Sequence, residues 1–310
     1  MAKRQYFVVD AFTSDRWAGN PAGVVLDAAG LSDSTMKAIA AEFNLSETAF
    51  VFAASGAPRG NTFHLRWFTP TVEVSMCGHA TVAAVHALVE SGRWHEFGLA
   101  DPKSGTASWH VQTLGGELTA FVERLPATTD KCMYWLDLVD PVLSEAPGRL
   151  DGLDMALGLE ETDRHVPAGP VRSQDDDLLL LVPNVARLNA CRPDFARLDA
   201  WCQATGIRGV CVATTETLTP AIHVQSRFFA PVAGVNEDPV TGSVHGPLAA
   251  WLVSLGIGAV GEGLTALSCV QGIPDRRCGL VHALVQLHEN GNAVRIGGQA
   301  VTAMHGTLAI

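Results

Sequence analysis

Apolar and polar positions follow two kinds of spacing along the chain, and the same order of elements occurs twice. Residues 63–70 and 222–231 read FHLRWFTP and IHVQSRFFAP, rich in aromatic and β-branched side chains and closed by proline. Such runs predict strands, because proline cannot continue a ladder of hydrogen bonds. Residues 79–92, HATVAAVHALVESG, are apolar on most faces and end at glycine, which predicts a buried central helix with a glycine cap.

Two further helices are predicted at corresponding places. One lies within 31–46, with Ser32 or Asp33 as N-cap, and the other within 194–206. The repeat is visible in RWFTP (66–70) against RFFAP (227–231), in ETAFVF (47–52) against GVCVAT (209–214), and in the helices at 76–92 and 240–256. Matches in the same order at nearly constant separation indicate a duplicated architecture.

The remaining segments predict how the two copies are joined. Residues 140–177 are acidic and contain proline and glycine, which predicts loop and linker, and 178–183 begins the second sheet. Residues 292–310 alternate like strands, with turns at Gly-Gly and His-Gly. We expect this last segment to cross back and complete the first copy.

Composition and charge exclude several classes of protein. The chain has 310 residues, 47% of them hydrophobic and 17% charged, and a formal net charge of −11. No run of Lys or Arg could neutralise phosphates, so no nucleic-acid partner is expected. The apolar run near the start is cut short by Asp10, and no stretch reaches the roughly 20 apolar residues of a membrane span, so we expect no membrane and a cytoplasmic location.

Cofactor and metal motifs are missing from the sequence. The seven cysteines never form CxxC, which argues against a disulfide framework or a structural zinc site. The histidines at 79, 86, 223 and 245 have no ligand spacing, and neither a phosphate-binding loop nor a dinucleotide fingerprint occurs. We therefore expect no metal and no cofactor.

The starts of the two central helices are candidate sites for an anion. Backbone N–H groups there lack helical partners and carry a partial positive charge, so they can hold a substrate carboxylate. The groups concerned belong to Gly78, His79 and Ala80 in the first copy and to Thr241, Gly242 and Ser243 in the second. Two ordinary helix starts are the alternative interpretation.

Positions that differ between the copies point to catalysis. Cys77 corresponds to Thr241, and a racemase that uses two thiols needs cysteine at both, so Cys77 is interpreted as a relic beside the site. Glu47 corresponds to Gly209 and lies between a helix and an apolar strand, where a carboxylate suits general acid/base work. A surface glutamate is the alternative there.

Two more polar residues are candidates on local grounds. Asp238 precedes the second central helix and could orient a substrate ammonium or a histidine, although a turn aspartate beside Pro239 is the alternative. His79 could relay a proton near neutral pH, or be a bystander.

In combination, the motifs resemble the PhzF-like phenazine-biosynthesis isomerase family, within the diaminopimelate-epimerase fold superfamily. The resemblance covers nearly the whole chain and is carried by DAFTSDRWAGNPAGVV (10–25), NLSETAFV (44–51), RWFTPTVEVSMCGHAT (66–81), EDPVTGSVHGPLAAWL (237–252) and GGQAVTAMHGTL (297–308). The chain departs from the family's usual pattern after Gln271, where relatives tend to carry a Gly-Arg-Pro-Ser-like run.

The resemblance implies an α/β (α+β) fold of two pseudo-symmetric domains, each a mixed sheet wrapped around a central helix. The domains would be 1–125 with 295–310, and 126–294, with the active site in the cleft between them. It also implies a cofactor-independent enzyme, commonly a homodimer. The catalytic residues would be Glu47, His79 and Asp238, and the substrate-binding residues Asn20, Cys77, Gly78, Thr241, Gly242 and Ser243.

The expected function is proton transfer on a small carboxylate-bearing substrate, of the trans-2,3-dihydro-3-hydroxyanthranilate isomerase type. Two alternatives remain open. One is an amino-acid racemase or epimerase that uses Glu47 and Cys77, and the other is a non-catalytic metabolite-binding protein.

Overall fold

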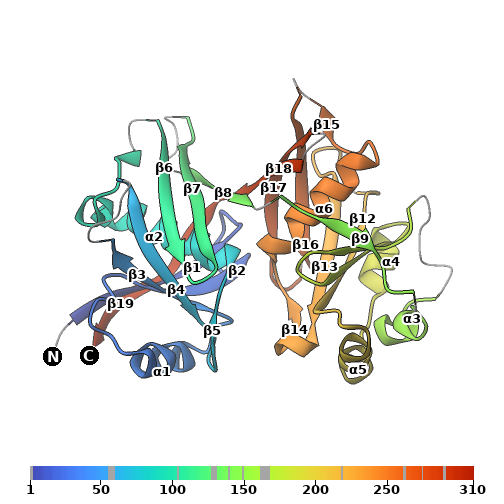
Figure 1. Ribbon diagram of the computed structural model, residues 1–310, viewed down its shortest axis with the longest axis horizontal. Coiled ribbons are helices and arrows are strands. Elements are labelled where there is room, and N and C mark those ends of the chain that lie inside the picture. The colour runs from blue at the N-terminus through green and yellow to red at the C-terminus, as the bar shows by residue number, and fades with distance from the viewer. Residues whose placement is uncertain are drawn as a thin grey trace. The chain divides into compact units, whose positions relative to one another are not determined.

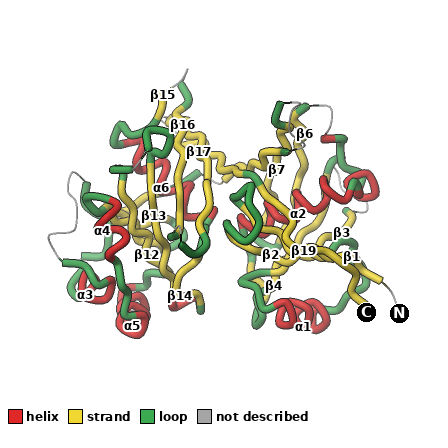
Figure 2. The backbone as a smooth tube through the Cα atoms, turned by 180° about the vertical axis from the view of Figure 1, so that it is seen from behind, coloured by secondary structure: helices red, strands yellow, loops and turns green. Residues whose placement is uncertain are grey.

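The computed structural model describes residues 3–54, 60–102, 105–126, 131–138, 140–148, 150–160, 168–217, 219–260, 263–273, 275–288 and 291–310. The chain separates into two compact units, Met1–Asp137 with Gly297–Ile310, and Leu138–Ile296. Figures 1 and 2 show the elements of each. The first boundary lies at 137 and not at the predicted 125, because strand β8 (Cys132–Leu138) pairs with β7 (Gly116–Arg124) and continues the first sheet.

The first unit is a mixed sheet in the order β19, β1, β2, β3, β4, β6, β7, β8. Only the β2–β3 and β4–β6 pairs are parallel among these. The other strands of this unit are β1 (Lys3–Ala11), β2 (Asn20–Val25), β3 (Thr48–Ala53), β4 (Thr62–Phe68), β5 (Glu73–Val74), β6 (Thr106–Thr113) and β19 (Ala300–Ala309).

Helix α2 (Gly78–Ser91) is the central element of this unit (Figure 1). Ten of its first eleven residues are buried, which its apolar composition on most faces predicts. It ends at Gly92, whose φ of 68° is the left-handed conformation of a glycine cap, as predicted. Helix α1 (Asp33–Phe43) and the 3-10 helix η1 (Arg93–Phe97) complete the unit.

The second unit repeats the pairing of five of these strands. β11 runs parallel to β12, β12 antiparallel to β13, β13 parallel to β16, and β16 antiparallel to β17, as β2, β3, β4, β6 and β7 do. Its strands are β9 (Leu143–Glu145), β10 (Val171–Ser173), β11 (Asp177–Leu181), β12 (Gly209–Thr214), β13 (Val224–Ala230), β14 (Val235–Asp238), β15 (Ala259–Val260), β16 (Thr265–Gly272), β17 (Cys278–His288) and β18 (Gly291–Gly298). Its helices are α3 (Leu153–Leu157), α4 (Val185–Ala190), α5 (Phe195–Thr205), α6 (Gly242–Ser254) and the 3-10 helix η4 (Pro231–Ala233).

A repeated ion pair holds the segment before each central helix. Arg66 of β4 binds Glu73 through two hydrogen bonds of 2.7 Å, and Arg227 of β13 binds Glu237 through bonds of 2.7 and 3.0 Å. Bidentate Arg–carboxylate pairs fix geometry as well as charge. The duplication therefore includes the contacts that fix the approach to α2 and to α6.

Two sequence predictions about connections are wrong. Part of the predicted linker is folded, because Leu153, Ala156 and Leu157 of α3 pack into the core formed with Leu178 and Leu198. The predicted turn at His305–Gly306 lies inside β19, which pairs with β1 without interruption there.

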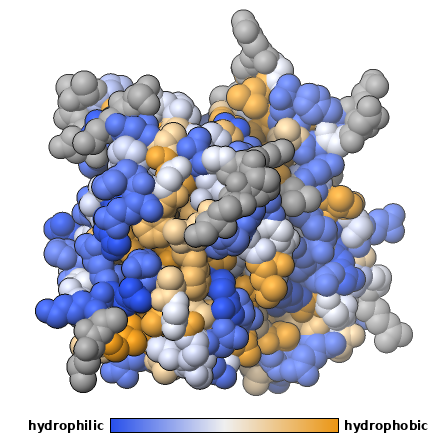
Figure 3. Space-filling view, turned by 60° about the vertical axis from the view of Figure 1, so that its left-hand side comes forward, coloured by the Kyte–Doolittle hydropathy of each residue, from blue (hydrophilic) through white to orange (hydrophobic). Residues whose placement is uncertain are grey.

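The surface combines polar residues with scattered apolar ones. Figure 3 shows hydrophobic residues among hydrophilic ones on one face. Trp17, Val72 and Leu114 are examples of exposed large apolar side chains. Among the described residues, no helix has both the length and the hydropathy needed to cross a bilayer.

Candidate active site

Glu47 lies in a short turn between α1 and β3. The turn begins where α1 ends, at Asn44, which has a left-handed φ of 51°. The Glu47 carbonyl then accepts a 3.1 Å hydrogen bond from the Gly23 N–H of β2. Ser32 caps the start of α1, as predicted. These contacts hold the backbone at Glu47 in place and so limit where its side chain can reach.

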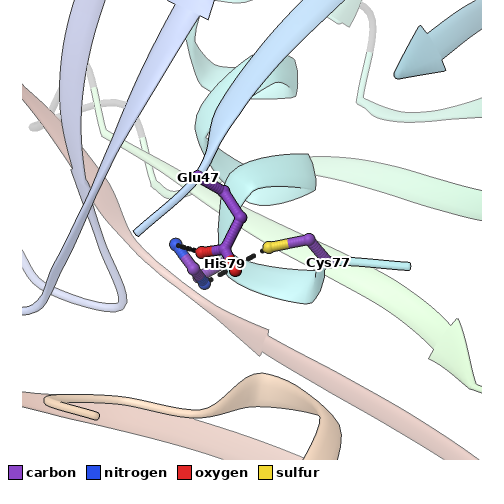
Figure 4. Close-up of side chains that lie close together, drawn as sticks. All are labelled: Glu47, Cys77 and His79. Atoms are coloured by element: carbon purple, nitrogen blue, oxygen red, sulfur yellow. Dashed lines mark hydrogen bonds and ion pairs between the residues drawn. The ribbon is translucent and has the colours of Figure 1, made fainter. Parts of the chain in front are cut away.

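Glu47, Cys77 and His79 converge at the start of α2 (Figure 4). Glu47 Oε2 lies 3.3 Å from His79 Nε2, and Cys77 Sγ lies 3.4 Å from His79 Nδ1. The imidazole therefore contacts the carboxylate with one nitrogen and the thiol with the other. The Glu47 side chain is 19% exposed and that of His79 only 7%, so the carboxylate is largely removed from bulk water.

The Glu47 carboxylate has capacity for another partner. Its Oε2 is buried and accepts no hydrogen bond among the described residues, since the contact with His79 Nε2 lacks hydrogen-bond geometry. Ser46 Oγ lies 3.4 Å from the same imidazole nitrogen. A buried acceptor without a donor is costly unless a substrate or ion completes it. A carboxylate oxygen with an unused acceptor position is suited to accept a proton from a substrate.

The N-termini of α2 and α6 lack side-chain caps. Helices α1 and α5 are capped by the side chains of Ser32 and Asp194, whereas the N-cap residues of α2 and α6, Cys77 and Thr241, make no such hydrogen bond. The first amides of these two helices, which include those of the predicted substrate-binding residues Gly78, Gly242 and Ser243, thus remain uncapped by side chains. Uncapped helix starts favour anionic ligands.

A second polar cluster precedes α6. Thr241 Oγ1 donates to Asp238 Oδ2 over 2.5 Å, and the fully buried Gln271 donates to the Asp238 carbonyl over 2.8 Å. Gln271 also accepts from the Thr241 N–H at 3.0 Å. Asp238, the last residue of β14, is thus held by a network and is not a free turn aspartate.

Sequence reasoning missed three residues near these clusters. Ser46 and Gln271 both touch predicted site residues, and only the departure from the family pattern after Gln271 signals the latter. His245 Nδ1 lies 2.7 Å from the Thr241 carbonyl, and burial lowers the pKa of this histidine to about 4. Burial therefore keeps the His245 imidazole neutral within α6.

Asn20 is the first residue of β2 and is almost completely buried. Asn20 pairs with Ala11 of β1. It lies three positions before Gly23, whose N–H donates to the Glu47 carbonyl. The cleft predicted from the sequence, and with it a shared role of the residues of both units, stays a prediction.

Known proteins with matching sequences and folds decide the family. The family model for phenazine biosynthesis-like proteins matches residues 9–306. The chain belongs to the PhzC/PhzF family. An uncharacterized isomerase of Pseudomonas aeruginosa is 37% identical to this family member over 303 residues, 97% of each chain.

Solved structures agree with this membership. A phenazine biosynthesis protein of the PhzF family from Bacillus anthracis covers 100% of both chains, with a TM-score of 0.86 and 26% identity. A hydroxyproline epimerase from Agrobacterium vitis shares the fold at 12% identity, with a TM-score of 0.62 over 99% of this PhzC/PhzF chain and 93% of its own. Two similarly built mixed α/β units are thus the fold of this family member.

Proposed function

We propose that the chain is a cofactor-independent isomerase that moves a proton within a small carboxylate-bearing substrate. Membership of the PhzC/PhzF family and relatives named as isomerases support the reaction class. The observation that carries the catalytic assignment is the largely buried Glu47 carboxylate, 3.3 Å from His79 Nε2 at the uncapped start of α2.

Glu47 is the base in this proposal. Its carboxylate takes a proton from an activated carbon, the electron pair of the broken C–H bond shifts into the neighbouring π-system, and a new C–H bond forms at another carbon. The proton returns from Glu47 directly or through His79, so no redox partner is needed. The amides at the starts of α2 and α6 bind anionic groups of the substrate, and Asp238 orients it.

Glu47→Gln tests the assignment. A positioned acid/base residue contributes roughly 10²- to 10⁴-fold in rate, so kcat with trans-2,3-dihydro-3-hydroxyanthranilate should fall by about that factor. Deuterium incorporation from D₂O, followed by NMR, measures turnover. The exposed Glu42→Gln variant is a matched control and should keep full activity. Equal activity of the Glu47→Gln variant and the unmodified chain would refute the role of Glu47.

An amino-acid racemase or epimerase is the second candidate. The contact between Cys77 Sγ and His79 Nδ1 favours it, because the imidazole can accept the thiol proton and leave a thiolate as a second base. Racemisation would appear as solvent deuterium at the α-carbon with inversion. A metabolite-binding protein without catalysis would exchange no proton with any ligand it holds.

A further inference from the structure

The cluster of Glu47, Cys77 and His79 has the composition of a metal site. Each residue offers one ligand atom, and these atoms lie within 4.8 Å of one another. Among the described residues, this is the one group of three or more His, Cys, Asp or Glu side chains whose ligand atoms lie this close together. The sequence spacing hides it, because the fold brings Glu47 to residues 30 positions further along (77 − 47).

The spacing of the thiol and the imidazole suits a tetrahedral ion. Zinc binds sulfur at about 2.3 Å and nitrogen or oxygen at about 2.0–2.2 Å, which places neighbouring ligands roughly 3.3–3.6 Å apart. Cys77 Sγ lies 3.4 Å from His79 Nδ1, and Glu47 Oε2 lies 3.3 Å from His79 Nε2. These two contacts involve different ring nitrogens, so an ion held by Cys77 Sγ and His79 Nδ1 requires the Glu47 carboxylate to turn from Nε2 toward Nδ1. The three ligand atoms already lie within 4.8 Å of one another, which keeps this movement short.

The charge of the ligands and the hydrogen bonds to them favour binding. A thiolate and a carboxylate together cancel the charge of a divalent cation, so the loaded site is neutral where its side chains are largely buried. With Nδ1 on the metal, the Nε2–H of His79 can donate to Ser46 Oγ, at 3.4 Å, and so orient the ring. The buried Glu47 Oε2 that accepts no hydrogen bond gains a partner.

We propose that Glu47, Cys77 and His79 bind Zn²⁺, and that the ion reversibly blocks the site. A thiolate, an imidazole and a carboxylate select zinc over the harder Mg²⁺ or Ca²⁺. The fourth coordination position is left to water. Binding stands independently of catalysis, whereas the block rests on the proposed function, since the ion occupies the lone pairs with which Glu47 and His79 move a proton.

Cobalt titration of the full chain tests binding without any substrate. After treatment with a chelator, Co²⁺ should give a near-ultraviolet thiolate-to-cobalt band and the visible bands of a tetrahedral site, and Zn²⁺ should displace it. Loss of a residue that hydrogen-bonds to a metal ligand already costs ~10–100-fold in affinity. Loss of a ligand itself in Cys77→Ser should therefore weaken Zn²⁺ binding by roughly 100-fold or more and abolish the sulfur band. Cys278→Ser, which alters a half-buried thiol of β17, should change neither.

The outcomes separate this proposal from the isomerase. The metal site is overturned if the unmodified chain gives no sulfur band. It is also overturned if the band survives in Cys77→Ser and the circular dichroism of that variant is unchanged. Neither result contradicts isomerase activity in the chelator-treated enzyme. Full turnover at saturating Zn²⁺ overturns the block alone. Loss of activity in the chelator, restored by Zn²⁺, overturns the inhibitory role and the cofactor-independent mechanism together.

Discussion

At the scale of single residues, the thiol is the informative case. Comparison of the two copies in the sequence suggests that Cys77 is a relic without a catalytic role, because its counterpart is Thr241. The structure places its sulfur 3.4 Å from the imidazole that also contacts Glu47. Comparison of the copies identifies which residues differ. Only the fold shows that two of them, Cys77 and Glu47, contact the same imidazole, that of His79.

Cys77→Ser distinguishes the two candidate chemistries. If Glu47 is the base of an isomerase, the variant should keep kcat within roughly 10-fold, below the ~10²- to 10⁴-fold contribution of a catalytic acid or base. Turnover under the conditions used for Glu47→Gln measures this. A loss as large as that of Glu47→Gln, together with inactivation by iodoacetamide, would favour the thiol-dependent racemase instead.

At the scale of elements, the central helices were predictable and their surroundings were not. Continuous apolar runs that end in glycine predicted α2, and aromatic runs closed by proline predicted β4 and β13. α3 escaped prediction because its five residues are too few to show a helical period among acidic, glycine-rich neighbours. The Gln271 network escaped because its three hydrogen bonds join residues about 30 positions apart in the chain.

Gln271→Leu should destabilise the second unit. The substitution keeps the approximate volume but leaves the Thr241 N–H without its acceptor, and an unpaired buried polar group costs about 1–3 kcal/mol. Urea unfolding of the full chain measures the loss. Gln112→Leu is the matched control, since Gln112 pairs with His64 of β4 as Gln271 pairs with Ser226 of β13. Equal unfolding midpoints for the two variants would contradict the network's contribution.

At the scale of the whole molecule, the return of the chain to the first unit was predicted from the alternation of residues 292–310. The structure shows how the returning strand is fixed. Thr302 of β19 donates to Glu90 of α2, and His86 Nε2 lies 3.2 Å from the same carboxylate. His86 Nδ1 also lies 2.9 Å from the Tyr134 hydroxyl of β8. One polar network thus joins α2 to both strands at which the chain passes between units.

This network should make stability depend on acid pH. The hydrogen bond with His86, and secondarily that with Thr302, lowers the pKa of Glu90 below its ordinary 4.5, against the opposing effect of burial. A depressed carboxylate stabilises the folded state above its unfolded pKa, and this contribution disappears as pH falls through the folded value. The unfolding free energy of the unmodified chain should therefore exceed that of Glu90→Gln at pH 7, and the difference should shrink below about pH 4.5. A difference that stays constant down to pH 3 in urea titrations would contradict this assignment.

The pairing of β1 with β19 has a consequence for biosynthesis. Residues 138–296 are contiguous and precede β19 in the chain, so all of the second unit is synthesised while one edge of β1 still lacks its partner. That edge stays open to mispairing until Ala300–Ala309 has been translated. The half of the molecule that is made first is therefore finished last.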